Sequence, residues 1–207
     1  MQIDWSKITL GTFNKIESIT SAELSDEEKT NRLIEVIFGV KAETLSIKDY
    51  LKKVKELAFL QEKIVPARVK SKYKIGKNEY TFDVAFTNFT ISQFMDFTNL
   101  KKNNGKVNEL IGCFLIPIGK EYGDYDRVAV NNDILNMGVE EAFGVTNFFI
   151  KQLAGFFKIF RFYSILRIMK TKLTWKQKKM MIQALNKSIK LNQMITEYYP
   201  TYSNTVK

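Results

Sequence analysis

The 207-residue chain contains no histidine, a single cysteine and only three prolines. Without histidine there is no Ser-His-Asp or Cys-His nucleophile, no imidazole general base and no histidine ligand for a metal. The lone Cys113 excludes an internal disulfide, a cysteine-rich zinc site and a CxxC redox pair. Glycine-rich phosphate-binding loops are missing as well. These absences predict a binding or assembly protein that is not an enzyme and that uses no cofactor.

Long apolar runs are also missing. The first twenty residues show no basic stretch followed by an apolar one, so we expect no secretory signal. The most apolar region, residues 142–169, is interrupted by four basic side chains, which are costly at the centre of a bilayer. The sequence therefore predicts a chain made in the cytoplasm, without membrane insertion.

The composition that is present is typical of a globular domain, with 45% hydrophobic and 13% aromatic residues. Residues 1–66 read as an N-terminal helical region. Ser25 and Glu28 form a capping box that starts a helix ending at Gly39, and Ser46 starts a second helix. Residues 1–24 show no clear period and are expected to be irregular or weakly stranded. Their scattered apolar anchors are Trp5, Ile8, Leu10 and Phe13.

The hydrophobic period changes from 3.6 to 2 after Pro66. Residues 67–90 therefore predict a two-stranded hairpin whose tip is Gly76-Lys77-Asn78-Glu79. Two strands are marginal in water, so the hairpin needs helices beneath it or a strand from another subunit beside it. The lysines at 70, 72, 74 and 77 are interpreted as protection of an exposed edge against aggregation.

Residues 91–196 are predicted to form a helical core with basic C-terminal helices. We expect helices near 91–98 and over 107–116, the second ended by Pro117, then a surface loop over 118–127. A helix of about thirty residues follows from Val139, and Thr174 caps the last helix. Residues 197–207 are predicted to form an extended tail. The predicted fold class is mainly α with one β-hairpin (α+β), a helical bundle in one domain overall.

Basic residues are concentrated near the C-terminus. The chain has 32 Lys and Arg against 22 Asp and Glu, which gives a net charge of +10. Residues 151–190 hold eleven basic residues and no acidic one, so this segment carries +11 and the remainder −1. Nine of the eleven make a candidate basic interaction face: Lys151, Lys158, Arg161, Arg167, Lys170, Lys172, Lys176, Lys178 and Lys179. Such segregation is informative because mixed surfaces are usual.

Three interpretations of the basic segment remain open. A basic face can neutralise DNA phosphates, lie on an anionic membrane surface, or meet an acidic protein neighbour in an assembly. Residues 148–162 are apolar nearly all round a helix, which is typical of a helix buried in a bundle or between subunits. No recognised nucleic-acid motif accompanies the charge, so the assembly interpretation is favoured over DNA contact.

One group of carboxylates has a spacing that suggests chemistry: Glu121, Asp124, Asp126 and Asp133. Two or three oxygens on a loop can hold Mg²⁺ or Ca²⁺, and a metal-dependent nuclease needs no histidine. The calcium-loop pattern is absent, however, and we interpret the group as a solvated acidic loop without a metal site. Cys113 lies in an apolar run and is predicted to be a core residue.

The order of four segments resembles a group of small structural or assembly proteins of tailed phages of Bacteroidetes, including crAss-like phages. The segments are FDVAFTNFT, ISQFMDF, VNELIGCFLIPIGKEYGDYD and DILNMGVEEAFGVTNFFIK, between Phe82 and about Lys151. The resemblance covers about a third of the chain and includes no catalytic motif.

This resemblance implies a virion protein, most simply a ring-forming subunit of the head-to-tail connector or tail. Its partners would be copies of itself and other virion proteins such as portal or tail proteins. The alternatives are a tail assembly chaperone and a DNA-binding internal virion protein. The aromatic tail is a candidate for docking onto a neighbouring subunit, because an extended segment can add to a sheet or groove. Its docking residues are Tyr198, Tyr199, Pro200 and Tyr202.

Overall fold

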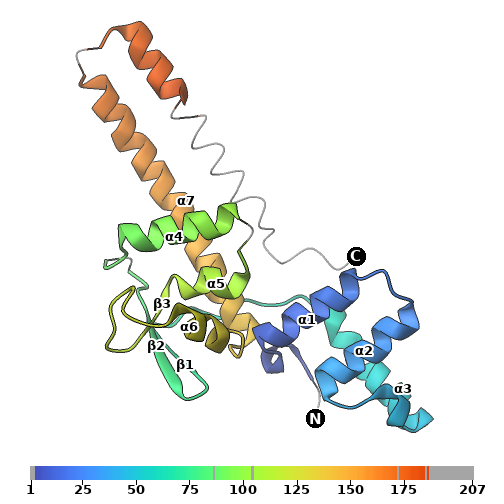
Figure 1. Cartoon of the computed structure of the whole chain (residues 1–207). Helices are drawn as coiled ribbons and strands as arrows, with labels where there is room; N and C mark the ends of the chain where they lie inside the picture. Colours follow the sequence, from blue (N-terminus) through green and yellow to red (C-terminus); the bar gives the residue numbers. More distant parts are fainter. Residues whose placement is uncertain (1–2, 86, 104, 172, 185, 187–207) are drawn as a thin grey trace. The chain divides into compact units, whose positions relative to one another are not determined.

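The computed structural model describes residues 3–85, 87–103, 105–171, 173–184 and 186 (Figure 1). For residues 101–102, 153–164 and 166–167 it describes the backbone alone. The chain divides into two compact units, with the boundary between residues 146 and 147. Both are mainly helical, and the first also contains a small antiparallel sheet, so the predicted α+β class is confirmed.

The first unit begins with helices where irregular structure was predicted. A 3₁₀ turn, η1 (Trp5–Lys7), is followed by α1 (Leu10–Ser21), and Thr9 caps α1 by accepting a hydrogen bond from the Thr12 amide. The prediction failed because Thr, Ser and Ile are weak helix formers, whereas burial of Leu10, Phe13 and Ile16 on one face outweighs propensity. All four predicted anchors are buried.

The next two helices begin and end where the caps predict. In α2 (Asp26–Phe38), the Ser25 hydroxyl accepts from the Glu28 amide while Glu28 accepts from the Ser25 amide. Gly39 ends α2 in the left-handed region, at φ 68°. Ser46 caps α3 (Ile47–Glu56). Short 3₁₀ turns, η2 (Ala42–Thr44) and η3 (Leu57–Gln61), flank α3.

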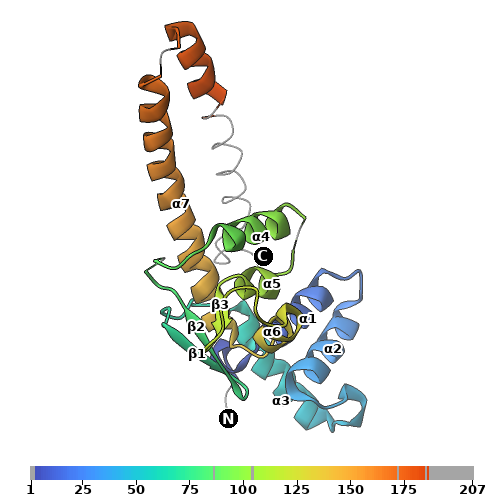
Figure 2. The ribbon, with the colours of Figure 1, turned by 60° about the vertical axis from the view of Figure 1, so that its left-hand side comes forward.

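The sheet has one more strand than was predicted. Strands β1 (Lys72–Ile75) and β2 (Asn78–Phe82) form the hairpin, and β3 (Leu115–Pro117) pairs antiparallel with β2, in the order β1-β2-β3 (Figure 2). Thr81 faces Ile116 across the new pairing. The hairpin turn contains only Gly76 and Lys77, with Gly76 at φ 60°. The strand that supports the hairpin thus comes from the same chain.

The helix predicted over 107–116 is therefore wrong in its second half. Helix α5 (Val107–Gly112) is short, and the chain then extends into β3. An apolar run of this length fits a buried helix or a buried strand equally well, and the pairing edge of β2 decides between them. The buried residues Tyr80, Phe82 and Leu115 join sheet and helices in one core.

Three helices complete the first unit. They are α4 (Ile91–Lys102), α6 (Arg127–Ile134) and the start of α7 (Val139–Met169). A Cβ on Gly144 would lie only 2.2 Å from the carbonyl oxygen of Ala67, so a glycine is required there. The Ala67 amide donates to the Glu140 carbonyl (2.9 Å), which holds residues 66–68 against α7.

The second unit contains the rest of α7 and a helix over residues 175–184. The length predicted for α7 is confirmed at 31 residues. Thr174 caps the following helix, as predicted: its hydroxyl accepts from the Gln177 amide, and the Gln177 side chain accepts from the Thr174 amide. In the described part of the chain, no helix is both long and apolar enough to span a membrane.

Candidate interaction sites

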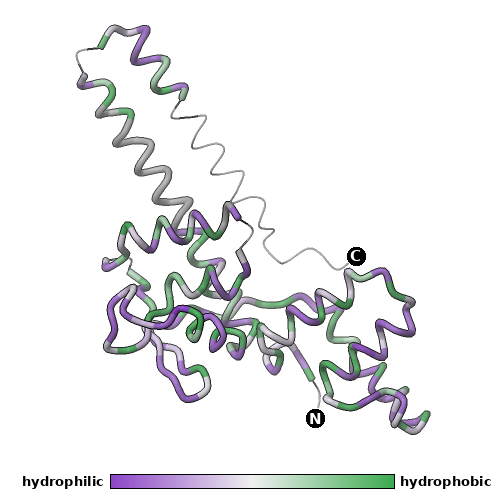
Figure 3. Tube along the Cα trace, in the orientation of Figure 1, coloured by the Kyte–Doolittle hydropathy of each residue, from purple (hydrophilic) through white to green (hydrophobic). Residues whose placement is uncertain are grey.

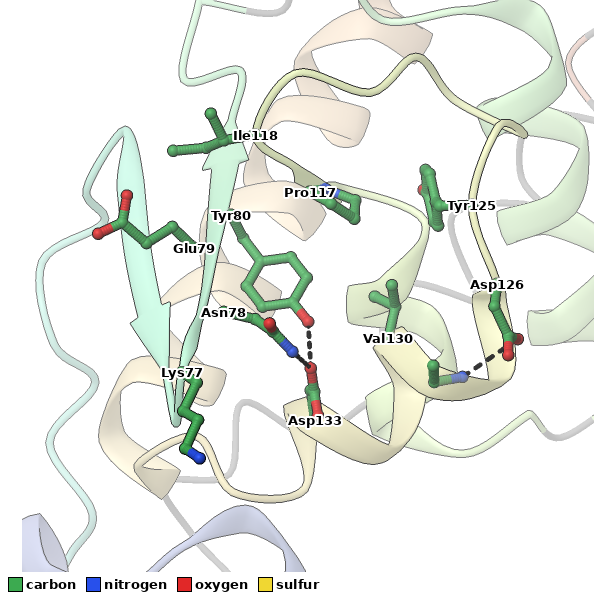
Figure 4. A pocket seen from close by; sticks show the side chains of 11 residues that line it. Lys77, Asn78, Glu79, Tyr80, Pro117, Ile118, Tyr125, Asp126, Val130 and Asp133 are labelled. Carbon is green, nitrogen blue, oxygen red and sulfur yellow. Dashed lines mark hydrogen bonds between the residues drawn. The ribbon is translucent and has the colours of Figure 1, made fainter.

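A hollow of about 480 Å³ lies in the first unit between the hairpin tip, the loop after β3 and α6 (Figure 4). We call it the α6 hollow. Three carboxylates, Glu79, Asp126 and Asp133, line it together with one lysine, Lys77, and the rings of Tyr80 and Tyr125. Apolar residues, among them Pro117 and Val130, complete its walls. The hollow therefore combines negative charge with aromatic and aliphatic surface.

Asp133 connects α6 to the hairpin. Its Oδ2 accepts hydrogen bonds from the Tyr80 hydroxyl and the Asn78 side-chain amide, each at 2.5 Å. Burial, and then the bond to Asp133, raise the pKa of the Tyr80 hydroxyl well above its usual value. Tyr80 thus stays a hydrogen-bond donor throughout the physiological range, and the position of the Asp133 carboxylate is fixed.

Asp126 is the N-cap of α6. Its Oδ1 accepts from the amides of Val128 (2.9 Å) and Ala129 (3.2 Å). A carboxylate here satisfies two amides that have no partner within the helix, and it faces the positive end of the helix dipole. This explains locally why the helix begins at Arg127.

The remaining acidic residues of the predicted group, Glu121 and Asp124, are exposed on the loop before α6. Among the described residues, no three histidine, cysteine, aspartate or glutamate side chains lie close enough to hold a metal ion. Asp126 and Asp133 instead have separate structural partners. Of the four residues in the predicted group, only Asp126 and Asp133 line the hollow.

A cluster of polar side chains also fixes the loop that precedes α6. Arg127 Nη1 donates to Asp96 Oδ2 (2.6 Å), and the Tyr122 hydroxyl donates to the same oxygen (2.7 Å). Arg127 also lies 3.6 Å from the Cys113 sulfur. Cys113 is fully buried, as predicted, and burial raises its pKa to about 11, partly offset by Arg127. The cluster ties the loop to α4 and positions one wall of the hollow.

The basic face belongs to the second unit, and the structure describes only some of its side chains. Lys151, Lys170, Lys176 and Lys179 are exposed. Lys178 is half-buried, and its ammonium group donates to the Met169 carbonyl (2.8 Å), at the negative end of α7. The side chains of Lys158, Arg161 and Arg167, and the whole of Lys172, lie outside the described part. The tail residues Tyr198, Tyr199, Pro200 and Tyr202 lie outside it as well.

Apolar side chains are exposed beside these lysines. Trp175 is 68% exposed and Met180 62%, and Met181 is also exposed. Figure 3 shows hydrophobic and hydrophilic residues alternating closely along this helix. The helix over 175–184 thus presents apolar and positively charged groups together.

No family model, curated protein or solved structure matches the chain.

Sequence reasoning identified Asp126 and Asp133 but none of the other groups that line the hollow, Glu79 among them. Tyr80 occupies an inward position in the predicted alternation, which indicates burial but not a bond to Asp133. Tyr125 and Arg127 carried no recognisable signal. The N-cap role of Asp126 had a local signal that was missed: an aspartate directly before a run that forms a helix.

Proposed function

We propose that this chain is a structural protein of a tailed-phage virion, a ring-forming subunit of the head-to-tail connector or tail. It assembles with copies of itself and with portal or tail proteins. The observation that carries the proposal is the concentration of eleven basic residues, without an acidic one, within residues 151–190 of the second unit.

Like charges at this density repel one another, and a neighbour that supplies negative charge removes the repulsion. Apolar exposure favours a protein neighbour over DNA. Trp175, Met180 and Met181 offer surface that another protein can bury, whereas the DNA backbone presents phosphates and sugars. The combination supports an acidic, partly apolar protein surface as the partner of this segment.

The first test is native mass spectrometry of the full-length protein at low and at high salt. We expect one discrete oligomer whose mass gives the copy number of the ring. A monomer at both salt concentrations and at every protein concentration would contradict assembly of the ring by this chain alone.

A tail assembly chaperone is the second candidate, and the exposed methionines favour it. Methionine is flexible and polarisable, so surfaces rich in it adapt to several apolar partners. A chaperone would be monomeric or dimeric and absent from purified particles, whereas a ring subunit would be present in fixed copy number. Quantitative mass spectrometry of purified virions separates the two.

DNA binding is tested with the purified full-length protein. A DNA-binding internal virion protein would bind duplex DNA with an affinity that falls steeply with salt, and replacing lysines within 151–190 would reduce that slope. Binding that is weak and insensitive to these replacements would leave the protein partner as the neighbour of the basic segment.

A further inference from the structure

We propose that the α6 hollow binds a lysine or arginine side chain from the 151–190 segment of a neighbouring copy. The inference rests on the proposed ring function and names the contact that would join one subunit to the next.

Two of the three carboxylates that line the hollow, Asp126 and Asp133, are held in place by hydrogen bonds to one oxygen only. Asp126 uses only Oδ1 for the backbone amides of α6, and Asp133 uses only Oδ2 for Tyr80 and Asn78. Within the described residues, the second oxygen of each carboxylate accepts no hydrogen bond. Each aspartate is thus fixed by one oxygen and can accept from an incoming cation with the other.

The accessible walls of the hollow also suit the incoming group. The half-buried ring of Tyr125, with Pro117 and Ile118, forms walls that suit an aliphatic stem. A lysine or arginine side chain has such a stem below its charged head, and aromatic faces attract the head. Lys77 also lines the hollow, and because it is exposed on the hairpin tip its long side chain can turn toward solvent when another cation enters.

Charge complementarity within the one sequence also favours this contact. Residues 121–141 contain six acidic residues and one basic residue, a net charge of −5, whereas residues 151–190 carry +11. Two segments of opposite net charge on one chain favour head-to-tail contacts between copies, and such contacts form a ring when the rotation closes.

The test introduces a competing cation into the hollow. Ala129 lines the hollow, is exposed and lies on α6, so Ala129→Lys places an ammonium group there without removing a buried side chain. The amide of residue 129, which donates to Asp126, is kept. Ala129→Gln is the matched neutral control, and Ala129→Glu adds negative charge. Thermal unfolding of all three checks that the fold is preserved.

Self-association of the full-length variants is measured by mass photometry over a concentration series. We expect Ala129→Lys to weaken the association constant about tenfold or more, because a like charge replaces an attraction. Ala129→Gln should stay near wild type and Ala129→Glu should equal or exceed it. Lys176→Glu with Lys179→Glu should weaken association in the wild type and restore part of it in Ala129→Lys.

The outcomes separate the two proposals. If the wild type associates and Ala129→Lys behaves like Ala129→Gln, the hollow is not the contact, although the ring function stands. If the wild type stays monomeric under all conditions, both the ring and this contact are overturned.

Discussion

Replacing Gly144 by alanine has two opposite effects on the free energy of unfolding, one through helix propensity and one through packing. In a helix interior, alanine is more favourable than glycine by about 1 kcal/mol, so propensity alone predicts a more stable protein. The structure predicts the reverse, because the new Cβ would lie 2.2 Å from the Ala67 carbonyl oxygen and 3.2 Å from its carbonyl carbon. These are backbone atoms, which cannot swing aside like the end of a side chain.

The backbone at Ala67 must therefore move by about 1 Å to reach ordinary contact distance, and it follows Pro66, whose ring restricts φ. That shift breaks or weakens the hydrogen bond from the Ala67 amide to Glu140, worth about 1 kcal/mol. Overpacking of this kind costs about 1–3 kcal/mol. After subtraction of about 1 kcal/mol for propensity, the expected loss is about 1–3 kcal/mol.

Urea unfolding followed by circular dichroism measures this difference, with Gly138→Ala as the control. At Gly138 a new Cβ would lie 4.0 Å from Oε2 of the Glu141 carboxylate, which is ordinary van der Waals contact. The control should lose less than about 1 kcal/mol, mainly through a poorer N-cap. A Gly144→Ala protein as stable as wild type, or more stable, would refute the close approach of residue 67 to α7.

Three further predictions concern the site. Tyr80→Phe removes the hydroxyl that donates to Asp133 and should lower the free energy of unfolding by about 1–2 kcal/mol in the same urea assay; an unchanged midpoint would contradict this bond. The buried Cys113 thiol should react with a maleimide only after unfolding, and rapid labelling of the native protein would show that it is accessible. Burial raises the pKa of Cys113 to about 11 and that of Tyr125 to about 12, so both groups hold their protons more tightly when folded. Their contribution to stability should be complete below pH 9 and lost between about pH 9 and 12, as alkaline unfolding with tyrosinate absorbance would show.

Local signals in the sequence were sufficient for several elements. The Ser25–Glu28 capping box, the Ser46 cap and the Gly76 turn each depend on residues within one turn of one another, and each was predicted. Helix α1 was missed because its residues have weak intrinsic preference and gain stability only when Leu10, Phe13 and Ile16 are buried by other parts of the chain.

Long-range partners account for what the sequence could not show. Residues 115–117 become a strand because β2 offers a pairing edge more than thirty residues earlier in the chain. The acidic group around Asp126 and Asp133 was recognised as a cluster, yet its use depends on Tyr80 and Tyr125, which only the folded sheet and loop bring beside it. Spacing along the chain therefore identified the charge of the site and not its shape.

The pairing of β2 with β3 has a consequence for synthesis. Strand β2 ends at residue 82 and β3 ends at residue 117, so 117 − 82 = 35 further residues must be translated before the sheet can be completed. At about 5–20 residues per second, one edge of β2 stays unpaired in the nascent hairpin for roughly 2–7 s. The lysines at 72, 74 and 77 carry charge on the hairpin throughout that interval. Protection of the hairpin by these charges is therefore needed most during synthesis, before the protein has finished folding.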